Sequence, residues 1–169
     1  MGIKNIFISR NLKKVKRKIQ FHNFETAKKI GLLYPVIDVE TDKIVKKYAK
    51  ELNNFELQTL GFVFNHEQLG NPYLGQGNSH YFTEKHFSKL GKIKETCISD
   101  FVNNEFDILI NLSQENNFYI DYVFGLSKAH FKVSGIKDCK YSDFNIDKSK
   151  NLNHFIEQVN KYLNIIKKA

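Results

Sequence analysis

Three polar side chains in the sequence stand at or just after the ends of short apolar segments. They are Asp38, His66 and Asn111. The segments have the apolar character of buried strands and comprise residues 30–34, 57–64 and 106–112. In an open α/β sheet, ligands bind beyond the carboxyl ends of the strands, where the strand order reverses. A carboxylate, an imidazole and an amide gathered there could bind a small polar molecule and exchange protons with it. The pattern therefore predicts a small-molecule pocket, with or without catalysis, lined by these three residues.

The other residues that could bind phosphate or metal match no established motif. Residues 70–77 contain three glycines, but no Lys-Ser/Thr pair follows them and no strand directly precedes them, so they do not match a phosphate-binding loop. Several histidines and acids share the irregular stretch 65–92, namely His66, Glu67, His80, Glu84 and His86. Their spacing fits no standard zinc pattern, and neither cysteine belongs to a paired motif. We therefore predict no metal site and no cofactor.

Nucleophilic catalysis is no better supported. Ser113 and Ser127 lack the glycine-flanked turn of a nucleophile elbow. Cys97 lies near the start of a short predicted helix, where a thiolate could be favoured, but a lone cysteine is more often a small buried hydrophobe. Asp107, directly before an apolar strand segment, could act as a general acid or base, as Asp38 could, yet carboxylates so placed are common in inert α/β proteins. We predict no catalytic residue and expect binding rather than catalysis.

The net charge of +8 lies at the N-terminus. Residues 1–29 contain nine basic side chains and one acid, which leaves 17 basic and 17 acidic residues in the rest of the chain. Leu12, Val15 and Ile19 recur at helical spacing, so residues 1–24 are predicted to form a basic amphipathic helix or arm in front of an α/β domain of residues 25–169. The basic positions expected to contact an acidic partner are Lys13, Lys14, Lys16, Arg17 and Lys18.

Several partners suit such a segment: RNA or a ribosome, an anionic membrane surface, or an acidic protein. The alternative is a solvated helix whose apolar edge docks on the rest of the chain. Only two of the 26 basic residues are arginine, and asparagine occurs eighteen times. Readers of base edges favour arginine, so a nucleic-acid contact would be with phosphate and would weaken strongly with salt.

Composition sets the broad class and the expected compartment. The chain has 169 residues, with 41% apolar and 14% aromatic side chains, which is typical of one globular domain. Its apolar runs are too short to span a membrane, and the N-terminus does not resemble a secretion signal. Two widely separated cysteines, Cys97 and Cys139, fit a reducing cytoplasm. The fifteen phenylalanines leave open a homo-oligomeric interface as a further role.

Short apolar segments alternate with helical patterns along the chain. Further strands are predicted at 129–133 and 141–146, and helices after Asp38, around 98–102, over 118–126 and from Leu152 to Ile166. Residues 65–92 are expected to be irregular, as an ordered lid or as a mobile loop. The alternation predicts a single three-layer, Rossmann-like α/β domain with a mostly parallel sheet of four to six strands.

Three stretches of the sequence carry a resemblance to known families. They are residues 29–33, the block 106–112 with 127–133, and residues 155–163. Together they resemble a small uncharacterised family of bacterial α/β proteins, a domain of unknown function of about this length, which supports the fold and implies no activity. The middle block also resembles the N-terminal half of heptosyltransferase-type glycosyltransferases. That resemblance implies a small-molecule or nucleotide-sugar site, although 169 residues leave no room for the nucleotide-sugar-binding second half.

Overall fold

The computed structural model describes residues 3–70, 74, 79–146 and 149–166. Six strands in these residues form one parallel sheet in the order β3-β2-β1-β4-β5-β6. The strands are β1 (Lys29–Val36), β2 (Glu56–Val63), β3 (Ser79–Phe82), β4 (Ile108–Asn111), β5 (Phe131–Ser134) and β6 (Phe144–Asn145). The strand order reverses between β1 and β4, as in doubly wound domains. The predicted Rossmann-like α/β class is confirmed.

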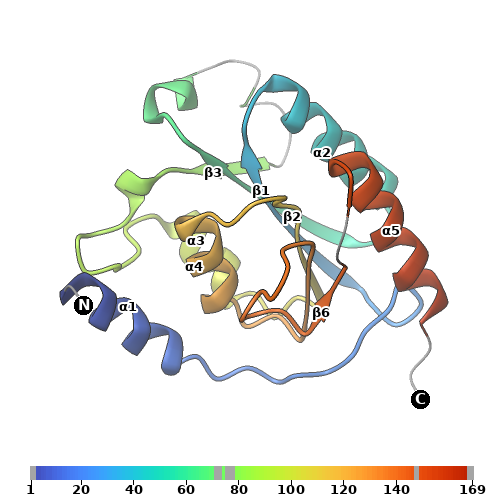
Figure 1. Ribbon diagram of the computed structural model, residues 1–169, viewed down its shortest axis with the longest axis horizontal. Helices are drawn as coiled ribbons and strands as arrows, with labels where there is room; N and C mark the ends of the chain where they lie inside the picture. The colour runs from blue at the N-terminus through green and yellow to red at the C-terminus, as the bar shows by residue number, and fades with distance from the viewer. Residues whose placement is uncertain (1–2, 71–73, 75–78, 147–148, 167–169) are drawn as a thin grey trace.

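Helices cover both faces of the sheet and make three layers (Figure 1). One face packs against α2 (Val39–Glu51) and α5 (Leu152–Ile165). The other packs against α3 (Thr96–Asn103) and α4 (Phe118–Leu126), with α1 (Ile3–Lys13) contacting α4. Two short 3-10 helices, η1 (His66–Gly70) and η2 (Glu84–His86), flank β3.

The two cores follow from the alternation of side chains along the central strands. Leu32 of β1 belongs to the core beneath α2 and α5, whereas its neighbour Leu33 belongs to the core beneath α3 and α4. Both side chains are fully buried, as expected for a parallel strand covered on both faces. In β4, Ile110 pairs with Leu32 and Asn111 pairs with Leu33, so Asn111 lies on the α3 and α4 side. The central strands therefore fix which side chains reach each face.

The N-terminal helix differs from the sequence prediction. It ends at Lys13, and residues 15–23 have no regular secondary structure, so Val15 and Ile19 do not extend it. Two contacts account for the change: the Arg17 side chain pairs with Asp143, and the backbone N–H of Gln20 donates to the carbonyl of His130. Helix propensity over such a short segment is weak, and these tertiary contacts outweigh it.

The stretch 65–92 is more ordered than the sequence indicated. It contains η1, β3 and η2, and β3 pairs in parallel with β2 along its whole length. The choice between lid and loop for residues 65–92 stays a prediction. Most of the glycine-rich segment 70–77, namely residues 71–73 and 75–78, lies outside the described residues. Both cysteines are free thiols. Within the described ranges, no helix has the length and apolar character to cross a membrane.

Candidate functional site

The reversal point between β1 and β4 is the place where ligands bind in this fold class. Asp38 lies just past β1 and is the N-cap of α2. Its Oδ1 atom accepts hydrogen bonds from the backbone N–H of Thr41 at 2.7 Å and from the Thr41 hydroxyl at 2.8 Å. These hydrogen bonds lower the pKa of the exposed Asp38 carboxyl. Asp38 is therefore an ionised, solvent-facing carboxylate whose first role is to begin a helix.

His66 lies past the end of β2 and contacts a different set of residues. Its Nδ1 atom is 3.1 Å from the hydroxyl of Thr83. Its ring packs edge-on against the ring of His86, with the two ring centroids 5.6 Å apart. The backbone N–H of Thr83 donates to Nδ1 of His86 at 3.3 Å. This arrangement brings two of the three histidines of the irregular stretch together, while His80 is exposed on β3. Burial lowers the pKa of His86, which keeps its ring neutral near pH 7.

Asn111 ends β4 and is fully buried. Its Oδ1 atom accepts from the backbone N–H of Ser113 at 3.0 Å. Its Nδ2 atom and the Ser113 hydroxyl are both buried without a hydrogen-bond partner in the described part of the chain. Unpaired buried polar atoms are rare and call for an explanation such as water or a ligand. Among the described residues, the hydrogen bonds of Asp38, His66 and Asn111 join none of the three to another.

A polar network lies beside the carboxyl end of the sheet, and no motif in the sequence predicted it. Asp42 of α2 accepts hydrogen bonds at Oδ1 from the hydroxyls of Tyr34, at 2.8 Å, and Tyr81, at 2.9 Å. Its Oδ2 atom pairs with Nζ of Lys46 at 2.7 Å. Burial raises the pKa of both tyrosines, so both hydroxyls keep their protons and donate. The network ties β1, α2 and β3 together.

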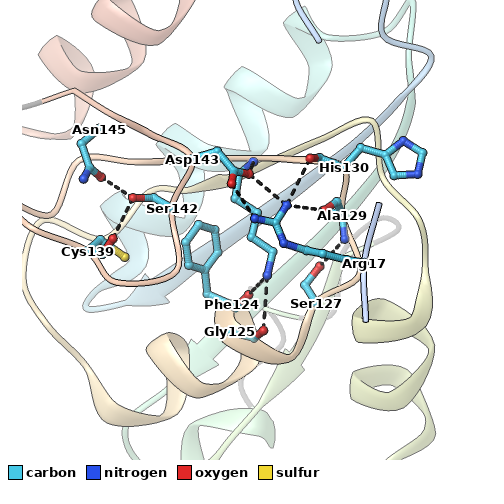
Figure 2. Close-up of polar contacts among 11 residues, drawn as sticks. Arg17, Phe124, Gly125, Ser127, Ala129, His130, Cys139, Ser142, Asp143 and Asn145 are labelled. Carbon is cyan, nitrogen blue, oxygen red and sulfur yellow. Dashed lines mark hydrogen bonds and ion pairs between the residues drawn. The ribbon is translucent and has the colours of Figure 1, made fainter. Parts of the chain in front are cut away.

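The basic N-terminal segment lies along the body, held by one arginine. Nη1 and Nη2 of Arg17 donate to the two carboxylate oxygens of Asp143 at 2.9 Å and 2.5 Å. Nη1 also donates to the carbonyls of Ala129 and His130, each at 3.1 Å. Figure 2 shows Arg17 between these carbonyls and Asp143, with the ring of His130 pointing away from the guanidinium. Arg17 is therefore engaged within the fold.

The four lysines around Arg17 are all exposed to solvent. They are Lys13, Lys14, Lys16 and Lys18. Of the five basic positions singled out in the sequence, these four present their charges outward and Arg17 does not. Apolar positions divide in a similar way: Ile8 is buried and Leu12 half-buried against α4, whereas Ile19 is 69% exposed. The apolar edge of α1 docks on the body, and the lysine-rich stretch follows it.

Lys132 is a buried cation that the sequence did not single out. It lies in β5 with 1% of its surface exposed, and its Nζ donates to the carbonyls of Phe124 at 2.7 Å and Gly125 at 3.3 Å. Burial lowers the pKa of Lys132 to about 7. These carbonyls belong to the last turn of α4, where a donor satisfies groups that the helix leaves unpaired. Lys132 is therefore explained by its role at the end of α4.

A second group of titratable side chains gathers at the opposite, amino edge of the sheet. Asp107 directly precedes β4, His130 directly precedes β5, and His22 lies in the N-terminal segment. Nε2 of His22 is 3.6 Å and Nδ1 of His130 is 3.7 Å from the same Oδ1 atom of Asp107. The other carboxylate oxygen of Asp107 accepts from the backbone N–H groups of Lys28 and Lys29 at 2.7 and 3.0 Å. The three facing atoms lie within 4.8 Å of one another.

The sequence pointed to Asp107 but not to the two histidines beside it. Metal motifs are recognised by short spacings on one or two elements, whereas His22 and His130 come from distant parts of the chain. Only the parallel pairing of β1, β4 and β5 brings these segments to one edge. Cys97, the candidate thiol, packs partly buried against the α3 and α4 core, and burial raises the pKa of its thiol. It therefore has the character of a small hydrophobe.

The fold and these sites define a Rossmann-like α/β domain with polar groups at both edges of its sheet. A family model described as a family of unknown function (DUF6913) matches residues 4–166. The chain therefore belongs to this family, and the resemblance to a domain of unknown function is confirmed. No curated protein matches the chain.

Proposed function

We propose that this protein is a binding domain whose lysine-rich N-terminal segment contacts an acidic partner. The observation that carries the proposal is that Lys13, Lys14, Lys16 and Lys18 are exposed while Arg17, in their midst, is fastened to Asp143. One internal ion pair thus holds a short row of outward-facing ammonium groups against the domain. Residues 30–169 contain equal numbers of basic and acidic side chains, so the net charge of +8 comes from the first 29 residues, in which this row lies.

Fixing the segment to the body favours binding because less conformational freedom remains to be lost when a partner docks. Lysine presents a compact point charge, which suits phosphate or carboxylate groups and gives no bidentate reading of base edges. The expected interaction therefore depends on charge and weakens as salt rises. The partner is defined by its chemistry, a surface rich in phosphates or carboxylates.

The test compares two quadruple variants of the full chain. One replaces Lys13, Lys14, Lys16 and Lys18 by glutamate and keeps Arg17. The matched control replaces four exposed lysines elsewhere, namely Lys43, Lys47, Lys50 and Lys137. Each reversal changes the charge by −2, so both variants have a formal net charge of zero instead of +8. Binding is measured to vesicles of phosphatidylserine and phosphatidylcholine and to single-stranded RNA, at low and moderate salt.

The native chain is expected to bind at least one of these probes, with affinity that falls as salt rises. The control should retain most of that binding, and the N-terminal variant should lose it about tenfold or more. The proposal fails if neither probe binds and affinity purification at low salt recovers the same partners with both variants. It also fails if the two variants weaken binding equally, because net charge and not the segment would then be responsible.

A second candidate function rests on the unpaired buried atoms at the carboxyl edge of the sheet. Nδ2 of Asn111 and the hydroxyl of Ser113 lack partners in the described residues, at the strand-order reversal where this fold class binds ligands. The exposed carboxylate of Asp38 begins the neighbouring helix, with His66 past the next strand. We infer a small-molecule or nucleotide-sugar site, related to half of a glycosyltransferase, as the alternative.

Thermal unfolding in the presence of nucleoside diphosphate sugars tests this alternative. A ligand that binds the native state raises the Tm with increasing concentration. The rise should be lost in Asp38→Ala and kept in the quadruple lysine variant. The absence of any shift at millimolar ligand, or an equal shift in Asp38→Ala, removes the alternative.

A further inference from the structure

The atoms that meet at the amino edge of the sheet are too far apart for hydrogen bonds and close enough to share an ion. The contacts of Asp107 Oδ1 with His22 Nε2 at 3.6 Å and with His130 Nδ1 at 3.7 Å exceed the range of an N–H···O hydrogen bond. Both nitrogens are buried and have no hydrogen-bond partner among the described residues. His22 itself is 7% exposed. Two buried nitrogens thus face one carboxylate oxygen without a bond between them.

The surroundings of His22 favour the tautomer that leaves its facing nitrogen unprotonated. Its other nitrogen, Nδ1, is 3.4 Å from the hydroxyl of Thr26. That hydroxyl is placed to donate to the side-chain oxygen of Asn23 at 3.1 Å and accepts from the backbone N–H of Asn23 at 3.1 Å, which leaves one lone pair to accept from Nδ1–H of His22. Nε2 then carries a lone pair directed at the carboxylate of Asp107. Two electron-rich groups facing each other repel unless a cation lies between them.

A proton is a poor candidate for that cation. The two imidazole rings stack with centroids 5.7 Å apart, so charging both rings would place two cations in contact. A single ion coordinated by both neutral rings avoids this cost.

We propose that His22, Asp107 and His130 bind one divalent transition-metal ion through Nε2, Oδ1 and Nδ1, with zinc the best fit to these ligands. Imidazole and carboxylate together suit zinc among the common divalent ions. Ligands bound about 2.1 Å from a tetrahedral zinc lie about 3.4 Å apart. The two nitrogen–oxygen separations therefore need to close by a few tenths of an ångström, and the two nitrogens, which lie within 4.8 Å of each other, have to reach the same spacing. The site is independent of the lysine row and goes beyond the proposed function.

The groups around the three ligands are those that a metal site needs. Thr26 fixes the ring of His22 through its second nitrogen, and the N–H groups of Lys28 and Lys29 hold the second carboxylate oxygen of Asp107. A surface hollow lined in part by Lys28 and Lys29 reaches two of the ligands, Asp107 and His130, so an ion can enter from there and solvent can complete its coordination. The bound ion would join the N-terminal segment, which carries His22, to the starts of β4 and β5.

The direct test is metal titration of the purified full chain after treatment with a chelator. Zn²⁺ binding is measured by calorimetry, and Co²⁺ is added as a visible probe that Zn²⁺ should displace. We expect one ion per chain with micromolar or tighter affinity. His22→Gln, His130→Gln and Asp107→Asn should each weaken binding about 100-fold or more, because loss of a supporting contact alone costs 10–100-fold. His80→Gln, which removes an exposed histidine from β3, is the matched control and should bind as the native chain does.

Thermal unfolding with and without Zn²⁺ separates metal binding from folding. Native chain and His80→Gln should show a Tm that rises with Zn²⁺ concentration, and the three ligand variants should not. Without metal, Asp107→Asn can keep an oxygen facing the N–H groups of Lys28 and Lys29 and should unfold close to the native Tm, so the loss of its response to Zn²⁺ reports on metal binding. The proposal is overturned if no saturable binding occurs, if the ligand variants bind as the native chain does, or if the cobalt spectrum shows thiolate ligands.

Discussion

The two terminal nitrogens of the Arg17 guanidinium donate hydrogen bonds to the two carboxylate oxygens of Asp143, at 2.9 and 2.5 Å. Asp143 also accepts from the backbone N–H of Lys132 at 2.8 Å, so one carboxylate joins the N-terminal segment, the start of β6 and β5. The two side chains keep only 14% and 16% of their surface exposed. A bidentate, partly shielded pair of this kind is stronger than an ordinary surface salt bridge.

Removing this pair should release the N-terminal segment without unfolding the sheet. Arg17→Ala is expected to lower the free energy of unfolding by about 2 kcal/mol, the usual worth of hydrogen bonds to charged groups. Hydrogen exchange in residues 15–22 should become faster in this variant. Chemical denaturation and exchange mass spectrometry measure the two effects, with Lys16→Ala at an exposed neighbouring position as the control.

A double-mutant cycle with Asp143→Asn isolates the pair itself. The two substitutions should interact by about 1 kcal/mol or more, since residues in one ion pair are not additive. Additive effects would mean that Arg17 acts mainly through the carbonyls of Ala129 and His130.

The buried carboxylate of Asp42 should matter more to stability than either tyrosine that it holds. Asp42→Ala removes the carboxylate that accepts from the Tyr34 and Tyr81 hydroxyls and pairs with Lys46, and it is expected to cost about 3–5 kcal/mol. Tyr34→Phe removes one donor and should cost about 1–2 kcal/mol. Urea unfolding checks this order, with Tyr162→Phe at the surface of α5 as the control. Equal losses for the two core variants would contradict the central role assigned to the carboxylate.

A substitution at Gly91, which lies against Ile8 of α1, should test how closely that helix packs on the rest of the protein. Gly91 has a φ of +79°, and a Cβ there would lie 2.9 Å from Ile8 and 3.1 Å from the Tyr122 hydroxyl. Gly91→Ala should therefore destabilise the protein by about 1–3 kcal/mol, from backbone strain and from contact with α1. Gly70→Ala, where a Cβ meets nothing within 4 Å, is the matched control and should change little. Similar losses of stability at the two positions would argue against close packing of α1 on Gly91.

Apolar runs and helical spacing predicted most of the strands and helices, because these elements depend mainly on residues close together in the sequence. The apolar run 106–112 predicted the central strand β4. The helix expected after Asp38 begins at Val39, with Asp38 as its N-cap. The helical spacing after Leu152 gave α5. The short strand β3 was not predicted, because its sequence, Ser-His-Tyr-Phe, shows little alternation of apolar and polar side chains. Its backbone pairing with β2 stabilises it as a strand.

The contacts that join distant segments could not be predicted in the same way. The spacing of Val15 and Ile19 indicated a helix, but Arg17 reaches Asp143 and the chain stays extended. His22, Asp107 and His130 carry no local motif, and only the strand order places them together. For the carboxyl edge, the sequence identified the right ends of the strands but could not foresee that Asn111 would be fully buried.

The carboxyl of Asp121 in α4 should make stability depend on pH in the direction opposite to most acids. Burial raises its pKa from 3.8 to about 6, against the effect of a hydrogen bond from the Asn117 backbone. Between these two pH values the folded state keeps a proton that the unfolded state releases, so stability falls as pH rises through this window. The full penalty is present above about pH 6 and absent below about pH 4.

Replacing this carboxyl by an amide should therefore stabilise the protein at neutral pH alone. A shift of this size corresponds to about 3 kcal/mol at most, and the partial exposure of the side chain reduces the expected gain to about 1 kcal/mol. Asp121→Asn should raise the free energy of unfolding by that amount at pH 7 and leave it unchanged at pH 3.5. Urea unfolding at both pH values measures the difference, with Glu115→Gln at an exposed position as the control. A gain of the same size at both pH values would assign the effect to packing around α4, because only a difference that disappears on acidification can come from the charge of Asp121.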